Sequence, residues 1–300
     1  MNLFQKNAKA VVLVACLAAS TAPIFIRMSG EMPALAIGFY RLLIAMPVFL
    51  FPVLTTHRDK LRAVTTPRLW YCVLSGFFLF LHFFTWNLSI AKTTIASASV
   101  ISSLHPIIIV VLSALFFQEK TRGKVIIGVV LALIGSAIIT GGDYSFSKEA
   151  LFGDFLAFLA GFFMALYLMA GRRLRPHIHS TVYMFLVFGS ALVFFAIAMV
   201  GTGDAFVGYA TSTWLSILAL GIINQIFVHG VFNWSLGYVS PLYVSTSQTG
   251  IVVFAAIMAF FLFAEIPTLW QYIGGIVTIA GIVWYNYYES RPGAPNRKAR

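Results

Sequence analysis

The chain has 300 residues, of which 60% are hydrophobic and only 10% are charged. A soluble domain carries about 25% charged residues. A soluble core of this size cannot hide so much apolar surface, so the composition excludes an ordinary soluble enzyme and indicates an all-α integral membrane protein. The formal net charge of +11 would suit nucleic-acid binding, but the placement of the charges favours a membrane-topology signal. The two cysteines, Cys16 and Cys72, lie in apolar segments and predict no disulfide framework.

Ten apolar segments each have the length, about 20 residues, that crosses a bilayer as a helix. Short connections with Gly and Pro leave no room for a soluble domain. A signal peptide at residues 1–20 is disfavoured, because the first apolar segment continues to Ile26. The expected spans are 8–28, 33–54, 69–91, 93–117, 122–141, 151–171, 181–201, 213–237, 240–263 and 268–287, followed by a disordered basic tail at 288–300.

The basic residues predict the orientation of these spans. With the N-terminus in the cytoplasm, 16 of the 20 Lys and Arg residues fall on the cytoplasmic side, and two, Lys92 and Lys148, fall in outside loops. This asymmetry predicts a multi-pass protein of the cytoplasmic (inner) membrane with both termini in the cytoplasm. The inside charges would lie among anionic head groups of the lipid bilayer, and no nucleic-acid partner is expected.

An internal repeat divides the chain into two halves. Residues 87–135 return without a gap at 233–281, an offset of 146 residues, with Glu119 matching Glu265. Identity within the repeat is low, so a chance match of two apolar segments is the alternative. Five spans per repeat is an odd number, so the second repeat would enter the membrane upside down. Such inverted repeats are typical of transporters, with the substrate site between the halves near the midplane.

Four stretches carry a resemblance to a known family. They are PALAIGFYRLLIA at 33–45, ASASVISSLHPIIIVVLSALFFQEK at 96–120, GDFLAFLAGFFMALYLMAGRRLR at 153–175 and AEIPTLWQYIGGIVTIAG at 264–281. In them the chain resembles the EamA (RhaT-like) family of the drug/metabolite transporter superfamily. The resemblance implies two five-helix repeats, here 8–141 and 151–287, a central cavity and transport of small metabolites. Small multidrug relatives use a Glu in the first helix to exchange protons for cationic drugs, and residues 8–28 contain no acid.

Polar residues within apolar spans are candidates for the substrate site, because their burial in lipid is costly. In the eighth span Gln225, His229 and Asn233 recur at i, i+4 and i+8 and share one helix face, with Asn224 beside it. This stripe would hydrogen-bond a substrate or, on the alternative interpretation, neighbouring helices.

The third span carries a second stripe with His82 and Trp86, although Trp86 taken alone suits an ordinary aromatic in a Phe-rich helix. His105 lies in the fourth span, beside Pro106, which is expected to kink that helix. Tyr243 and Ser247 share a face of the ninth span at i and i+4. If transport is coupled to protons, His82, His105 and His229 are the candidate carriers, because histidine titrates near neutral pH.

Arg41 lies inside the second span. It would clamp a carboxylate or phosphate of the substrate, or it is a structural arginine that reaches outward or caps helix carbonyls.

Several further residues are interpreted as structural. Glu119, Glu265 and Asp154 are expected to satisfy free backbone donors at the starts of the fifth, tenth and sixth spans. Two glycine pairs at i, i+7 predict close helix contacts: Gly128 with Gly135, and Gly274 with Gly281.

The sequence predicts a secondary transporter that moves a small organic metabolite, an amino acid or a related neutral or anionic solute, in the export direction by alternating access. No catalytic, cofactor or metal motif is present in the sequence, so an enzyme is not expected. A channel and a membrane-embedded enzyme acting on lipid or isoprenoid are the alternatives. Assembly as a homodimer stays open.

Overall fold

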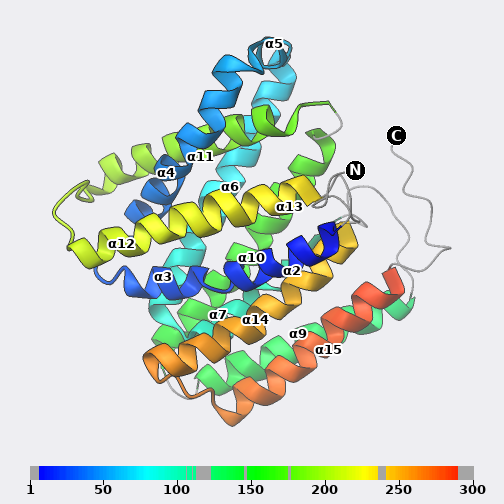
Figure 1. The fold of residues 1–300 in the computed structure, drawn as a ribbon. Helices are drawn as coiled ribbons and strands as arrows, with labels where there is room; N and C mark the ends of the chain where they lie inside the picture. Colours follow the sequence, from blue (N-terminus) through cyan, green and yellow to red (C-terminus); the bar gives the residue numbers. More distant parts are fainter. Residues whose placement is uncertain are drawn as a thin grey trace.

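The computed structural model describes residues 7–105, 107–109, 111–112, 123–144, 147–174, 177–235 and 241–289. Within these ranges the side chains of 140–144, 172, 233, 241–247, 249–250, 286 and 289 are not described. The described ranges form helices joined by short turns and contain no strand (Figure 1). The expected tail from 290 onward and Pro106 lie outside them.

The helices of the first half begin within three residues of the expected spans. They are α2 (Ala8–Ala19), α3 (Ala22–Met28), α4 (Ala34–Thr55), the short α5 (Arg58–Arg62), α6 (Thr66–Lys92), α7 (Ile95–Ser102) and α9 (Gly123–Tyr144). The first expected span is therefore two helices in line. The side chains of Ser20 and Thr21 donate to the carbonyls of Leu17 and Ala18, at 2.6 Å each, and occupy backbone acceptors where α2 ends.

The second half of the chain is likewise helical. It comprises α10 (Lys148–Leu174), α11 (Ser180–Thr202), α12 (Thr211–Ala219), the π-helix η1 (Leu220–Val228), α13 (His229–Ser235), α14 (Pro241–Phe263) and α15 (Leu269–Glu289). The eighth expected span is therefore continuous, but its middle turns are wider than those of an α-helix.

Six of these helical segments are long and apolar enough to cross a membrane. They are Ala8–Met28, Ala34–Thr55, Thr66–Lys92, Lys148–Gly171, Ser180–Thr202 and Thr211–Phe232. Shorter apolar helices follow at Ile95–Ile109, Gly123–Ile139, Ile251–Phe263 and Leu269–Tyr285. The expectation of a helical, multi-pass membrane protein is confirmed at this level.

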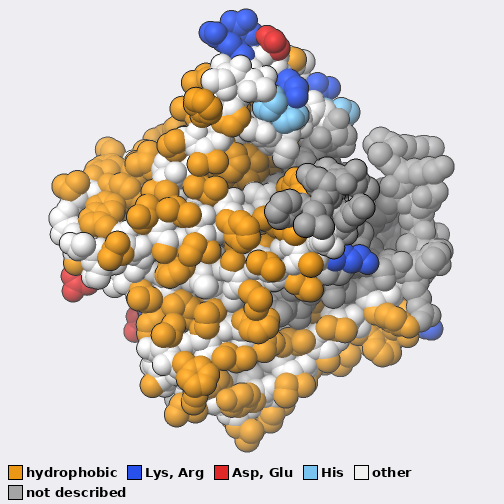
Figure 2. All heavy atoms as spheres, viewed as in Figure 1, with side chains coloured by type: hydrophobic (Ala, Val, Ile, Leu, Met, Phe, Trp, Pro, Cys, Tyr) orange, Lys and Arg blue, Asp and Glu red, His pale blue; other side chains and the backbone are white. Residues whose placement is uncertain are grey.

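Large apolar side chains cover the outside of the helix assembly (Figure 2). Phe51, Val200, Phe261 and Ile276 are 71%, 72%, 77% and 68% exposed, although water would disfavour each of them. On the face shown, Lys and Arg side chains gather instead around α5 (Figures 1 and 2). A broad apolar surface beside such a charged end is what a lipid bilayer requires.

Three pairs of equivalent helices pack on one another across the two halves. The offset of 146 residues takes the first residues of α4, α7 and α9 onto the first residues of α11, α14 and α15. In the structure α4 packs on α11, α7 on α14, and α9 on α15. The last pair lies side by side along most of its length (Figure 1).

Glycines allow the α9–α15 contact to be made at backbone distance. A Cβ on Gly128 would lie 2.7 Å from the carbonyl oxygen of Gly281, and one on Gly135 would lie 2.5 Å from that of Gly274. The earlier glycine of α9 thus meets the later glycine of α15, so the two helices run antiparallel. The expected role of these glycines in close packing is confirmed.

This contact predicts that Gly135→Ala destabilises the protein. The new methyl group would lie 2.4 Å from the backbone nitrogen of Thr278, which cannot move without shifting α15. We expect a loss of about 1–3 kcal/mol, the usual cost of overpacking a close contact. Thermal unfolding of the detergent-purified protein measures it.

The matched control is Gly230→Ala in α13, where nothing lies within 4 Å of the added methyl group. Here alanine should be neutral or stabilise the helix by up to about 1 kcal/mol. Equal melting temperatures for the two variants would contradict the close-packing account.

Candidate functional site

A single guanidinium lies at the centre of the candidate site. Arg41 of α4 is 2% exposed. Its Nε donates to Oε1 of Gln225 at 3.0 Å, and its Cζ lies 3.8 Å from the ring centroid of Phe83, a cation–π contact. Arg41 therefore points into the protein, and the alternative of an arginine that reaches outward is wrong.

The π-helix η1 presents two neighbouring amides to this region. Gln225 is fully buried, and its Nε2 has no hydrogen-bond partner among the described residues. Asn224 is 2% exposed and donates through Nδ2 to the hydroxyl of Thr21 at 3.2 Å, while its Oδ1 has no partner there. π-helical turns are often found at functional sites, because their wider geometry points side chains in directions that a regular α-helix does not.

Two histidines lie around the guanidinium. Arg41 is within electrostatic range of both His82 and His229. The ring of His229 meets the rings of Phe83 and Phe188 edge-on, with centroids 5.9 and 6.3 Å apart. The structure thus brings together Arg41, Gln225 and His229 from the predicted set.

The histidines His82 and His105 also have backbone contacts, and the remaining predicted residues lie against the apolar core or outside the described side chains. The Nδ1 of His82 lies 2.8 Å from the carbonyl oxygen of Ala160 in α10, and that of His105 lies 3.3 Å from the Ser102 carbonyl. Trp86 is half-buried against the main apolar core. The side chains of Asn233, Tyr243 and Ser247 lie outside the described residues.

Two aromatic residues of this site were not predicted. Phe83 and Phe188 are both buried, and they supply the rings against which the guanidinium and His229 pack. The sequence offers only a weak signal for Phe83, which follows His82 directly. It offers none for Phe188, since α11 is rich in apolar residues throughout.

A second polar network lies at one end of the helices. Arg27 of α3 pairs with Glu265, with Nη1 to Oε1 at 2.7 Å. Its Nη2 also donates to the carbonyls of Ile90 and Thr93, at 2.6 and 2.8 Å. The other carboxylate oxygen of Glu265 accepts from the backbone nitrogen of Ile95 at 3.0 Å. These contacts join the ends of α3, α6, α7 and α14.

The contacts of two acidic residues correct the expectations for them. Glu265 does serve a helix start, but that of α7 rather than the tenth span. Thr268 and Gln271 cap α15 reciprocally, with hydrogen bonds of 3.0 and 3.2 Å. Asp154 lies inside α10, not at its start, and accepts from the Thr93 hydroxyl at 3.0 Å. Glu119 lies outside the described residues.

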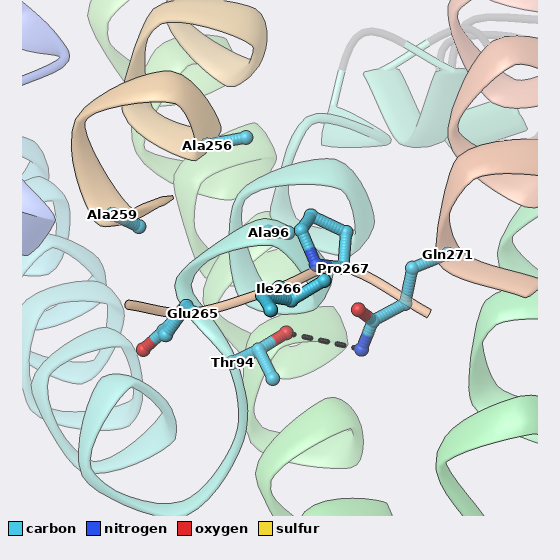
Figure 3. Close-up of a pocket in the computed structure, with 8 residues that line it drawn as sticks. All are labelled: Thr94, Ala96, Ala256, Ala259, Glu265, Ile266, Pro267 and Gln271. Carbon is cyan, nitrogen blue, oxygen red and sulfur yellow. Dashed lines mark hydrogen bonds between the residues drawn. The ribbon is translucent and has the colours of Figure 1, made fainter. Parts of the chain in front are cut away.

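A small pocket of about 60 Å³ adjoins this network. In Figure 3, Gln271 reaches across it to Thr94, and the hydrogen bond from Nε2 to Oγ1 measures 3.2 Å. Gln271 also donates to Ser97 at 3.0 Å. The pocket's lining residues are Thr94, Ala96, Ala256, Ala259, Glu265, Ile266, Pro267 and Gln271, and they include none of the predicted site residues.

Several proteins with a similar sequence are named as transporters or efflux pumps. A protein named "Uncharacterized transporter" from Archaeoglobus fulgidus is 28% identical over 271 residues, which cover 86% of this chain and 90% of that protein. The "Probable amino-acid metabolite efflux pump" of Escherichia coli is 24% identical over 194 residues, covering 62% and 65% of the two chains.

One solved structure, titled "Crystal structure of protein", matches 94% of this chain and 97% of its own with a TM-score of 0.67. At 20% identity it supports the fold alone. The sequence model of the EamA-like transporter family matches residues 8–141 and 151–287, which is most of the chain. The resemblance seen in the sequence is confirmed, and the chain belongs to the EamA-like transporter family.

Proposed function

We propose that the chain is a secondary transporter that exports a small organic metabolite, an amino acid or a related neutral or anionic solute, by alternating access. The observation that carries this proposal is the antiparallel contact of α9 and α15 through equivalent glycines. Gly128 meets the counterpart of Gly135, and Gly135 meets the counterpart of Gly128. A two-fold axis generates such reciprocal contacts.

An axis that relates antiparallel membrane helices lies in the membrane plane. On this proposal the chain has ten spans, and the halves 8–141 and 151–287 are inverted repeats. Two nearly equivalent halves can adopt two nearly equivalent arrangements, one open to each side. The pairing of α4 with α11 and of α7 with α14 supports the same axis.

The position of the guanidinium site supports solute binding between the halves. Arg41 and Phe83 come from the first half, and Gln225, His229 and Phe188 come from the second. A substrate held here would contact both halves, as alternating access requires. The E. coli relative, named as a probable amino-acid metabolite efflux pump, supports the substrate class and the export direction.

Counterflow distinguishes a carrier from the alternatives. Proteoliposomes are loaded with an unlabelled mixture of protein amino acids and diluted into the radiolabelled mixture. We expect the label to accumulate transiently above its equilibrium level, because a carrier exchanges inside solute for outside solute. A channel gives equilibration without an overshoot, and an enzyme acting on lipid gives no uptake; either result would contradict the proposal.

The Arg27–Glu265 network should open and close during transport. With the N-terminus inside, it lies on the outer side and joins both halves. Each charge-assisted hydrogen bond contributes about 1.5–3 kcal/mol. The test places a single cysteine at Ala259, which lines the pocket and is 1% exposed. In the variants Arg27→Gln and Glu265→Gln, this cysteine should react on the order of tenfold faster with a membrane-impermeant thiol reagent.

The labelling uses a background with Cys16 and Cys72 replaced by alanine. Lys92→Gln is the matched control, because it breaks the other ion pair, Lys92–Glu149, whose carboxylate side chain is 66% exposed and well screened by water. The exchange of both charges, Arg27→Glu with Glu265→Arg, should restore slow labelling. Equal rates in the native pair, the single variants and the control would show that the network does not gate this end.

A further inference from the structure

Arg41 has no counter-ion among the residues that the structure describes. The ion pairs found there are Arg27–Glu265 and Lys92–Glu149, both at helix ends. An arginine stays charged under all physiological conditions. A buried charge without an opposite partner is unfavourable, so a fold that keeps one needs a compensating interaction.

The neighbours of Arg41 orient it without neutralising it. The Phe83 ring covers one face of the guanidinium, and the amide oxygen of Gln225 accepts from Nε. Both contacts fix the plane of the group. Its two terminal nitrogens are left without a hydrogen-bond acceptor among the described residues.

The amide of Gln225 carries a second unused donor. Because its oxygen faces Arg41, its Nε2 points elsewhere, and that nitrogen is buried with no acceptor in the described structure. An unsatisfied buried donor is unfavourable for the same reason as an unpaired charge. Two elements from different halves of the chain, α4 and η1, thus present free donors in one buried region.

We propose that the carboxylate of the transported solute binds here, with its oxygens accepting from the terminal nitrogens of Arg41 and from Nε2 of Gln225. This inference rests on the proposed transport function and adds the chemical class of the substrate. A planar carboxylate fits the fork of a guanidinium, and its single negative charge balances the single charge of Arg41. A phosphate dianion would need a second cation beside Arg41.

The substitution Gln225→Glu tests the site directly. It places a carboxylate where the amide oxygen now accepts from Nε, and the protein then supplies the missing counter-ion itself. We expect the melting temperature of the detergent-purified protein to rise and counterflow of amino acids to be lost, because the internal carboxylate displaces that of the solute.

Asn224→Asp is the matched control for the melting temperature. It adds the same charge one residue away, on a side chain that bonds Thr21 rather than Arg41. This uncompensated buried carboxylate should lower the melting temperature. If Gln225→Glu exchanges amino acids like the native chain, or melts as low as Asn224→Asp, the carboxylate site is wrong.

Competition separates a failure of this site from a failure of transport. Counterflow of the radiolabelled amino-acid mixture is measured with excess unlabelled amino acids or with the corresponding amino-acid amides, in which a neutral carboxamide replaces the carboxylate. We expect the amides to compete at least about tenfold more weakly, because they lose a charge-assisted hydrogen bond. Equal competition by the amides would overturn the site and leave the transporter standing, whereas the absence of any counterflow would overturn both.

Discussion

The structure depends on contacts in which three helices of the first half, α4, α7 and α9, pack on their counterparts in the second half, α11, α14 and α15. In the contact between α9 and α15, four glycines allow backbone to meet backbone. Between helices in lipid, apolar side chains gain little by association, so van der Waals contact at short range has to hold them together. The glycines make this contact available, and their positions impose the antiparallel arrangement.

This arrangement places the candidate site. Because α4 packs on both α11 and η1, Arg41 meets Gln225 across the boundary between the halves. The guanidinium is therefore held by one amide and one ring rather than by an acid of its own half. A shift of either half would change its surroundings, and this couples the site to the relative position of the two halves.

The two polar regions have different chemistry. At the helix ends Arg27 has a carboxylate partner and two backbone carbonyls, so its hydrogen-bonding capacity is largely used within the protein. Arg41 has one amide and one aromatic ring. The first arrangement suits a contact that holds elements together, and the second suits recognition of an external anion.

Much of the fold could be predicted from the sequence, because lipid requires long apolar helices and these leave a plain hydropathy pattern. The glycine contacts followed from spacing alone. The π-helix in the eighth span could not be predicted, because its wider turns depend on neighbouring helices rather than on a local motif. The same limit applied to Phe83 and Phe188, whose roles arise only when α6 and α11 meet around His229.

For the charged residues, too, the sequence predicted the need for a partner but not the partner itself. Burial of Arg41 inside a span was evident, but its direction depended on the Gln225 partner 184 positions away. Glu265 was assigned to the nearest helix start along the chain, whereas its partners, Arg27 and Ile95, are distant in sequence. Local rules identify which residues need a partner, and only the packing of the helices identifies the partner.

The most direct measurement of the central claim is the sidedness of two equivalent positions. Thr56 follows the last residue of α4, and Thr202, which lies 146 residues later, ends α11; both are exposed. Single cysteines at these positions, in a background without Cys16 and Cys72, are labelled with a membrane-impermeant reagent in intact cells and in inside-out vesicles. Inverted repeats predict labelling of the cysteine at 56 only from the cytoplasmic side and of that at 202 only from the outside. Labelling of both from one side would contradict the inverted arrangement.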